Sequence, residues 1–178
     1  MMTLEPAEGS RWVAGVVALA AVDPLAGARV LGEPSIYWER PLAREAVAGW
    51  GEASAVEALS AAQAQAVLRA LSAPDSVRWL GDAPTALPGP WFGGMRFSAA
   101  GGDSGWDSFG FGRWTLPEVV VWREGPGLVA AAFAPEGPAA RDVVRSRLAR
   151  VAAAFPAGYC QAVDGPQTLR LTSSRPDF

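Results

Sequence analysis

The side chains that could carry chemistry in this chain are almost all carboxylates, hydroxyls and arginines. All 15 basic residues are arginine, because the sequence contains no lysine and no histidine. A chain without histidine cannot build a Ser-His-Asp or Cys-His nucleophile system, nor a histidine-ligated metal site. Without lysine it cannot form a Schiff base, use a lysine as general base or complete a phosphate-binding P-loop. Several large classes of enzyme mechanism are therefore excluded for this chain taken by itself.

The carboxylates form no evident catalytic pair or metal site. Glu39 and Glu45 flank a proline turn, and Glu118 follows another proline farther along the chain. Asp103 and Asp107 lie in the glycine-rich stretch DSGWD, which lacks the number of oxygen ligands found in an EF-hand calcium loop. We therefore expect no catalytic carboxylate pair and no metal ligand in this chain.

The single cysteine, Cys160, rules out an intramolecular disulfide and suits a reducing compartment. No histidine or lysine is present to activate its thiol, and no serine lies in a G-x-S-x-G motif. A hydrolase that uses Cys160 or a serine is therefore a weak alternative. A structural thiol is the default interpretation.

Charge and hydropathy argue against nucleic-acid and membrane partners. The net charge is −3 without any basic run, and only Arg96 and Arg113 lie near the aromatic segments, so the electrostatic footprint of nucleic-acid binding is missing. The apolar run 12–22 is shorter than the ~20 residues that span a bilayer. Glu5 and Glu8 precede it, where an export signal would be basic. We expect a cytoplasmic protein in which this run is a buried strand.

The chain length of 178 residues and the hydrophobic content of 50% predict one domain with a sizeable core. Hydrophobic periodicity and turn residues predict an α+β fold with an antiparallel-rich sheet of about six strands and two main helices. The predicted strands are residues 11–22, 35–40, 45–54, 91–97, 113–124 and 127–134, with a further short strand at 168–171. The predicted helices cover 60–71 and 138–155, and 78–90 is expected to be irregular. Strands 113–124 and 127–134 should pair as a hairpin.

Local signals define both helices. Ser60 and Gln63 form a capping-box pattern, and apolar residues follow at helical spacing until Pro74 stops the first helix. Pro138 suits the first position of the second helix, whose arginines, Arg147 among them, should point away from its apolar stripe. That stripe consists of Val144, Leu148, Val151 and Phe155.

The segment WFGGMRF, residues 91–97, combines aromatic residues with a glycine pair. It does not fit a dinucleotide-binding fingerprint, because more strand follows the glycines where a helix would be needed. We interpret it as a scaffold strand whose glycines let a neighbouring backbone or ring come close. The glycines of the segment 45–54 suggest a bulge or a similar close approach. The residues assigned to this structural scaffold are Trp91, Phe92, Gly93, Gly94, Phe97, Gly49 and Gly51.

Six phrases follow one another over most of residues 12–124: AVDPL at 21–25, IYWERP at 36–41, AGWGEA at 48–53, WFGGMRF at 91–97, WDSF at 106–109 and LPEVVV at 116–121. In this order and spacing they resemble the amino-terminal part of isochorismate synthases. These enzymes belong to the chorismate-utilising family, which also includes salicylate, anthranilate and aminodeoxychorismate synthases. The final third of the chain is similar to that family only in general character.

The resemblance implies a fold like half of the chorismate-utilising β-sandwich, with WFGG as a scaffold strand and Arg96 as a departure from the family pattern. It implies a parent reaction that converts chorismate to isochorismate with Mg²⁺. In that reaction a lysine is the general base, a glutamate is the general acid and further glutamates hold the metal. These groups are expected in a carboxy-terminal half that would begin shortly after SSRPDF, residues 173–178. No catalytic, substrate-binding or metal-binding residue carries over, and no cofactor is expected in this chain.

We therefore expect residues 1–178 to form a single non-catalytic domain of a larger isochorismate synthase-like enzyme, with 156–178 as a tail or linker toward the catalytic half. That missing half is the expected partner, and the apolar surface it would cover is expected to cause self-association of the isolated chain. The resemblance fits menaquinone, siderophore and salicylate biosynthesis alike. The alternative is a stand-alone module on the same scaffold, which binds a protein partner or a small acid through arginines such as Arg96 and Arg113.

Overall fold

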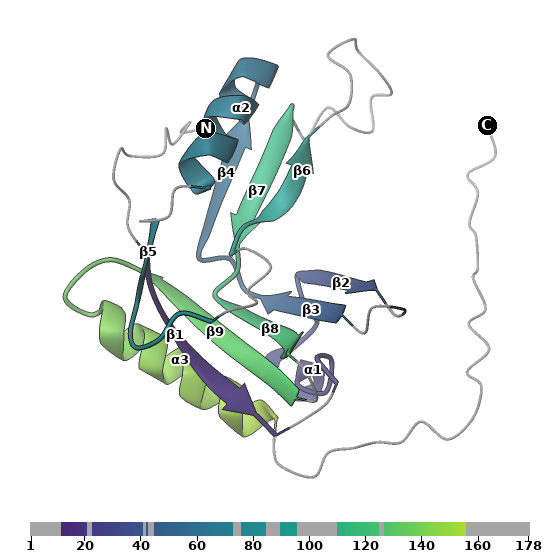
Figure 1. Cartoon of the computed structure of the whole chain (residues 1–178), viewed down its shortest axis with the longest axis vertical. Coiled ribbons are helices and arrows are strands. Elements are labelled where there is room, and N and C mark those ends of the chain that lie inside the picture. Colours follow the sequence, from purple (N-terminus) through teal and green to yellow (C-terminus); the bar gives the residue numbers. More distant parts are fainter. Residues whose placement is uncertain are drawn as a thin grey trace.

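The computed structural model of the chain describes residues 12–20, 23–40, 42, 45–72, 76–84, 90–95, 110–124 and 127–155. These residues form nine strands in two sheets and three helices (Figure 1). The larger sheet is mixed and has six strands, and the smaller one is antiparallel and has three. The predicted α+β class with two main helices is confirmed. The described strands outnumber the six expected, because one of the predicted strands is divided and two further short strands were not expected.

The six-stranded sheet has the order β2-β3-β8-β9-β1-β5 (Figure 1). Its neighbouring strands are antiparallel except β1 and β5, which are parallel. The predicted hairpin is confirmed, because β8 and β9 pair with Glu124 opposite Gly127. The bounds are β1 Trp12–Leu19, β2 Ile36–Arg40, β3 Glu45–Trp50, β5 Val77–Trp79, β8 Val119–Glu124 and β9 Gly127–Pro135.

The three-stranded sheet has the order β4-β7-β6, and helix α2 (Ala61–Leu71) lies against it (Figure 1). Ala64 and Val67 of this helix are buried in a cluster with Trp114 of β7. A sheet of three strands needs such a cover to bury its apolar face. The bounds are β4 Ser54–Ala58, β6 Phe92–Met95 and β7 Gly112–Leu116.

The start of α2 follows the predicted capping pattern with one change. The Ser60 hydroxyl accepts a hydrogen bond from the backbone N–H of Gln63 at 3.3 Å. The Gln63 side-chain oxygen accepts from the backbone N–H of Leu59 at 2.8 Å, one residue earlier than in a standard capping box. Two backbone donors at the helix start are thereby satisfied, and the predicted position of this helix is confirmed.

Helix α3 (Ala140–Ala154) covers one face of the six-stranded sheet (Figure 1). Val144 and Val151 have no exposed surface. Phe155, directly after the helix, packs edge-on against Trp50 of β3 with ring centroids 6.3 Å apart. The predicted apolar stripe therefore faces the sheet.

The opposite face of the six-stranded sheet is covered where the two sheets meet. Trp12, Val120 and Phe133 are buried on this face, and Trp91 and Phe92 pack against them. Trp91 also packs against the cluster beneath α2, and its ring meets that of Trp12 edge-on with centroids 6.2 Å apart. Trp91 therefore bridges the two sheets.

Residues 113–124 do not form the single strand expected. They form β7 and β8, which belong to different sheets. Pro117 separates them, because proline has no N–H for the ladder and restricts the conformation of the residue before it. The Pro117 ring lies close to β3, where a Cβ added at Gly49 would be 2.9 Å from it. Gly49 thus lies at a close approach between the two chain segments.

The single strand expected over residues 45–54 ends earlier than predicted: only Ser54 belongs to the next strand, β4, whose residues 55–58 were not expected to form a strand. Strand β3 ends at Trp50, and Gly51 turns the chain with a φ of +70°, a conformation that favours glycine. The chain then enters β4 in the smaller sheet. A 2.8 Å hydrogen bond from Ala53 N to Leu116 O joins this passage to the one before Pro117. The two passages between the sheets therefore lie side by side.

The remaining differences from expectation are local. Residues 78–90, expected to be irregular, include most of β5, which pairs with the start of β1. Of the predicted strand 91–97, the structure describes β6, while Arg96 and Phe97 lie outside the described residues, as does 168–171.

The helix starts also differ from the sequence-based account. The interpretation of Pro138 as the first helical residue is wrong, because Ala139 is the N-cap of α3. Pro138 lies in the preceding turn. Helix α1 (Ala28–Leu31), a single turn, was not expected.

Arg147 joins α3 to the passage between β7 and β8. Its guanidinium donates hydrogen bonds to a carboxylate oxygen of Glu118 and to the backbone oxygen of Phe133. The expectation that the arginines of this helix point away from the sheet is wrong for Arg147, whose side chain is only 22% exposed. Shielded, charge-assisted hydrogen bonds contribute more to stability than ion pairs in full contact with water.

Replacing Arg147 with alanine should lower the free energy of unfolding by about 1–3 kcal/mol, because a carboxylate and a carbonyl lose charge-assisted hydrogen bonds. Arg145→Ala, on the exposed side of the same helix, is the matched control and should change it by less than about 0.5 kcal/mol. Urea unfolding followed by circular dichroism measures both variants. Equal effects would show that the contacts of Arg147 add nothing to stability.

Gly93 in β6 occupies a position where a side chain has no room. A Cβ there would lie 2.0 Å from the carbonyl oxygen of Arg113 and 2.7 Å from the Cα of Trp114. At the next residue, Gly94, no heavy atom lies within 4 Å of an added Cβ. The close approach of β6 and β7 therefore depends on the first glycine of the pair and not on the second.

Gly93→Ala should push β6 away from β7 and lower the free energy of unfolding by about 1–3 kcal/mol, the usual cost of overpacking. Gly94→Ala is the control and should be neutral or stabilising by less than about 1 kcal/mol, because alanine loses less chain entropy on folding than glycine. The two unfolding midpoints measure the difference. A Gly93→Ala protein as stable as the wild type would contradict the steric explanation.

Candidate functional site

A cavity of about 460 Å³ lies where the end of α2, strand β5 and the smaller sheet meet. Ligand sites usually have volumes of about 300–1,000 Å³, so it is large enough for a small molecule. Three of its lining residues are tryptophans from different elements, and two are serines. The lining includes Trp79, Trp91, Trp114, Leu71, Ser72 and Ser76.

The three indole rings are held in place by core contacts. Strand β5 pairs with β1, and the Trp79 ring meets that of Phe133 edge-on with centroids 6.1 Å apart. Trp114 lies opposite Gly93 in the β6–β7 ladder and is 5% exposed. Trp91 packs on both sheets. Because the core fixes these rings, the cavity is part of the folded scaffold and does not depend on one loop.

The described lining of the cavity offers polar groups but no charge. Its polar side chains are those of Ser72, Ser76 and the three tryptophans, and the indole N–H of Trp91 is buried without a hydrogen-bond partner among the described residues. A serine needs a neighbouring base to act as a nucleophile, and no base lines the described part of this cavity. Among all the residues that the structure describes, no group of three or more potential metal ligands comes together.

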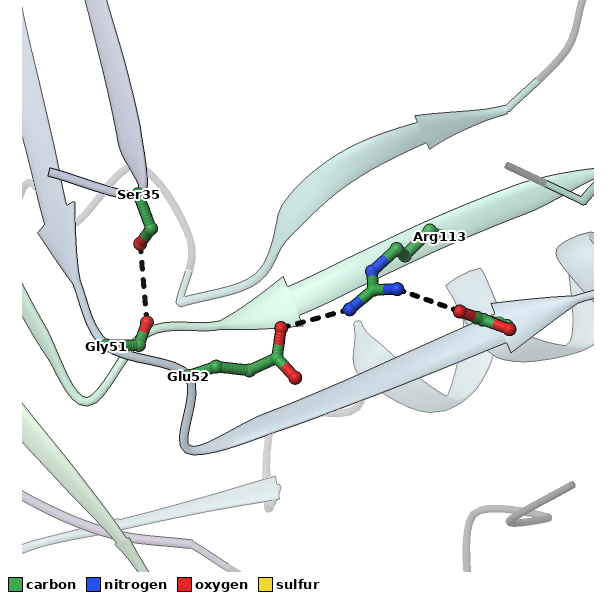
Figure 2. A network of polar contacts seen from close by, with 5 residues as sticks. Ser35, Gly51, Glu52 and Arg113 are labelled. Atoms are coloured by element: carbon green, nitrogen blue, oxygen red, sulfur yellow. Dashed lines mark hydrogen bonds and ion pairs between the residues drawn. The ribbon is translucent and has the colours of Figure 1, made fainter. Parts of the chain in front are cut away.

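Arg113 of β7 lies in a polar network on the smaller sheet (Figure 2). It donates to Glu57, its cross-strand partner on β4, at 2.9 Å and to Glu52 at 3.1 Å. Figure 2 also shows the Ser35 hydroxyl, which donates to Gly51 O at 3.3 Å. Two carboxylates thus already neutralise the Arg113 charge, which makes this arginine a poor anion-binding group.

The carboxylates singled out in the sequence do not form a pair. Glu39 accepts a hydrogen bond from the Tyr37 hydroxyl at 2.6 Å, and Glu45 accepts one from Arg40 at 2.7 Å. Glu118 is bound by Arg147. Each of these carboxylates therefore has a structural partner. Asp103, Asp107 and Cys160 lie outside the described residues.

The scaffold residues assigned from the sequence fall into two places. Trp91 and Gly93 line the cavity, and Phe92 packs on the larger sheet. Gly49 and Gly51 lie at the passages between the sheets, where an added Cβ would meet Pro117 and Glu118 respectively. Gly94 is exposed, and Phe97 lies outside the described residues.

Trp79 and Trp114 were not identified as site residues from the sequence. They are 35 positions apart and meet only through the pairing of β5 with β1 and of β6 with β7. The one sequence signal was the total of eight tryptophans, which does not indicate which of them gather. Trp114 lines the cavity and is also buried.

Tyr37 on β2 has an altered ionisation. Partial burial, then the hydrogen bond to Glu39 and the negative charge of that carboxylate, raise the pKa of Tyr37 to about 12. The phenol therefore stays protonated at neutral pH. It lies on an edge strand, away from the cavity lining.

Ultraviolet titration of tyrosinate should show Tyr37 ionising near pH 12, above the ordinary value of about 10, and Tyr37→Phe should remove that transition. Because the folded pKa is raised, the stability from this group is present below about pH 10 and is lost as the pH rises toward 12. Glu39→Gln should lower the pKa of Tyr37 in part, because it removes the nearby negative charge. An unchanged transition in Glu39→Gln would show that Glu39 does not contribute.

No protein-family model matches the chain, and no curated protein matches its sequence significantly. Within the described residues, none of the helices has the length and apolar character needed to cross a bilayer. The residues and their geometry are therefore the basis for a functional proposal.

Proposed function

We propose that this chain is the amino-terminal, non-catalytic part of an isochorismate synthase-like enzyme and acts as the scaffold for a catalytic half. The observation that supports this most is the place of WFGG in the fold. Trp91 packs on both sheets, and Gly93 allows the close pairing of β6 with β7. The described part of this phrase, one of the six that resemble isochorismate synthases, thus has a packing role.

The residue types of the chain are consistent with the same proposal. The chain contains no lysine, so a reaction that uses a lysine as general base has no candidate for it. Glu52 and Glu57 are paired with Arg113, and Glu118 with Arg147. No described cluster could hold the Mg²⁺ of the parent reaction, so that metal does not fit the residues described here. In the proposed enzyme the chemistry belongs to the other half.

Strand β2 is the surface that best fits such a partner. It lies at the edge of the six-stranded sheet, and an edge strand presents backbone groups that another strand can pair with. Tyr37 and Trp38 on this strand are 44% and 45% exposed. We propose that the catalytic half covers this edge, and that without it the edge promotes self-association.

A stand-alone binding module is the second candidate, and the cavity beside α2 is the observation that favours it. A small acid is a poor match for the described residues. Arg113 is already bound by Glu52 and Glu57, and Arg96 lies outside the described residues. If the chain is a stand-alone binding module, a ligand that is not an anion, or a protein partner, fits the described residues better than a small acid does.

Turnover of chorismate tests the scaffold proposal. The isolated chain with Mg²⁺ should produce no isochorismate above the uncatalysed rate, because it supplies no lysine base. Mixing it with the catalytic half of an isochorismate synthase, expressed without its own amino-terminal part, should restore turnover. Gly93→Ala should weaken that restoration and Gly94→Ala should not. Isochorismate formed by the isolated chain in proportion to its concentration would contradict the proposal.

A further inference from the structure

The walls of the cavity beside α2 carry no described charge and are rich in aromatic surface. Trp79, Trp91 and Trp114 contribute three indole rings, whose faces carry negative electrostatic potential. Leu71 and Ser72 belong to the last turn and C-cap of α2, where the helix dipole places partial negative charge on the carbonyl oxygens. No described lining residue carries a positive charge. The indole N–H of Trp91 is buried without a hydrogen-bond partner in the described part of the chain. The described wall therefore offers an anion hydrogen-bond donors but no opposite charge.

The same walls favour a positive charge attached to an apolar body. A cation over an indole face is attracted by the ring quadrupole, and tryptophan is the strongest of the aromatic residues in this respect. The carbonyl oxygens at the end of α2 and the hydroxyls of Ser72 and Ser76 accept hydrogen bonds from an ammonium group. The apolar remainder of such a ligand would pack on Leu71 and the tryptophan rings.

We propose that this cavity binds a small organic cation, an aryl- or alkylammonium compound, in preference to an anion of the same shape. Its volume of about 460 Å³ admits a ligand of this size. The proposal goes beyond the scaffold function and does not depend on it, because it uses only the chemistry of the cavity wall. It also replaces the small acid considered for a stand-alone module with a ligand of opposite charge.

A pair of nearly isosteric probes tests the sign of this preference. Calorimetric titration of the full chain with 3-phenylpropylammonium should show saturable binding. The anion 3-phenylpropanoate should bind about tenfold more weakly or not at all, given the usual strength of a cation–aromatic contact. Equal or tighter binding of the anion would overturn the proposal, as would the absence of saturable binding by the cation.

Charge substitutions in the wall locate the binding in the cavity. Ser76→Glu should tighten binding of the ammonium probe several-fold and Ser76→Arg should weaken it, because the same position gains opposite charges. Trp79→Phe should weaken binding less than Trp79→Leu. Trp38→Leu on β2, outside the cavity lining, is the control and should leave affinity unchanged.

The two Ser76 substitutions leave the core contact between Trp79 and Phe133 intact, so their effect on affinity does not depend on that contact. Thermal unfolding of each variant shows whether it is folded before it is titrated. Identical affinities for Ser76→Glu and Ser76→Arg would place the probe elsewhere and contradict the assignment. Loss of this binding would leave the chorismate turnover experiment unaffected, so the two proposals fail separately.

Discussion

The constraint on which the structure depends is that the central strands of the six-stranded sheet are buried on both faces. Val120 and Val121 of β8 have no exposed surface, although successive residues of a strand point to opposite faces. Each face therefore needs its own cover. Helix α3 covers one face, and Trp91 with Phe92 covers the other at the junction with the smaller sheet. The continuous apolar runs of β8 and β9 follow from this arrangement.

Because both faces of the larger sheet are covered, the fold depends on the two segments where the chain leaves one sheet and enters the other. Pro117 and Gly51 redirect the backbone from one sheet to the other, and the hydrogen bond between Ala53 and Leu116 holds both passages together. Arg147 then links the passage at Glu118 to α3. One charged side chain thus connects the helix on one face to the junction that covers the other.

The elements defined by local signals were predictable from the sequence, and those defined by distant contacts were not. The Ser60–Gln63 pattern and the stripe that includes Val144 placed both main helices, because capping and helical periodicity act within a few residues. The breaks between strands at Gly51 and Pro117 had local signals as well, but assigning the resulting strands to different sheets requires knowledge of long-range pairing. The cavity was not predictable, since its tryptophans come from distant segments of the chain that meet only in the fold. The assignment of no catalytic residue rests on missing residue types and required no structure.

The intact mass of the protein isolated from its own organism tests most directly our proposal that this chain is the non-catalytic part of a larger isochorismate synthase-like enzyme. The account predicts a mass several tens of kilodaltons above the 18.6 kDa of this sequence, with a lysine-bearing catalytic half in the additional chain. An intact mass of 18.6 kDa, with no second polypeptide bound to it, would contradict the claim and favour the stand-alone binding module.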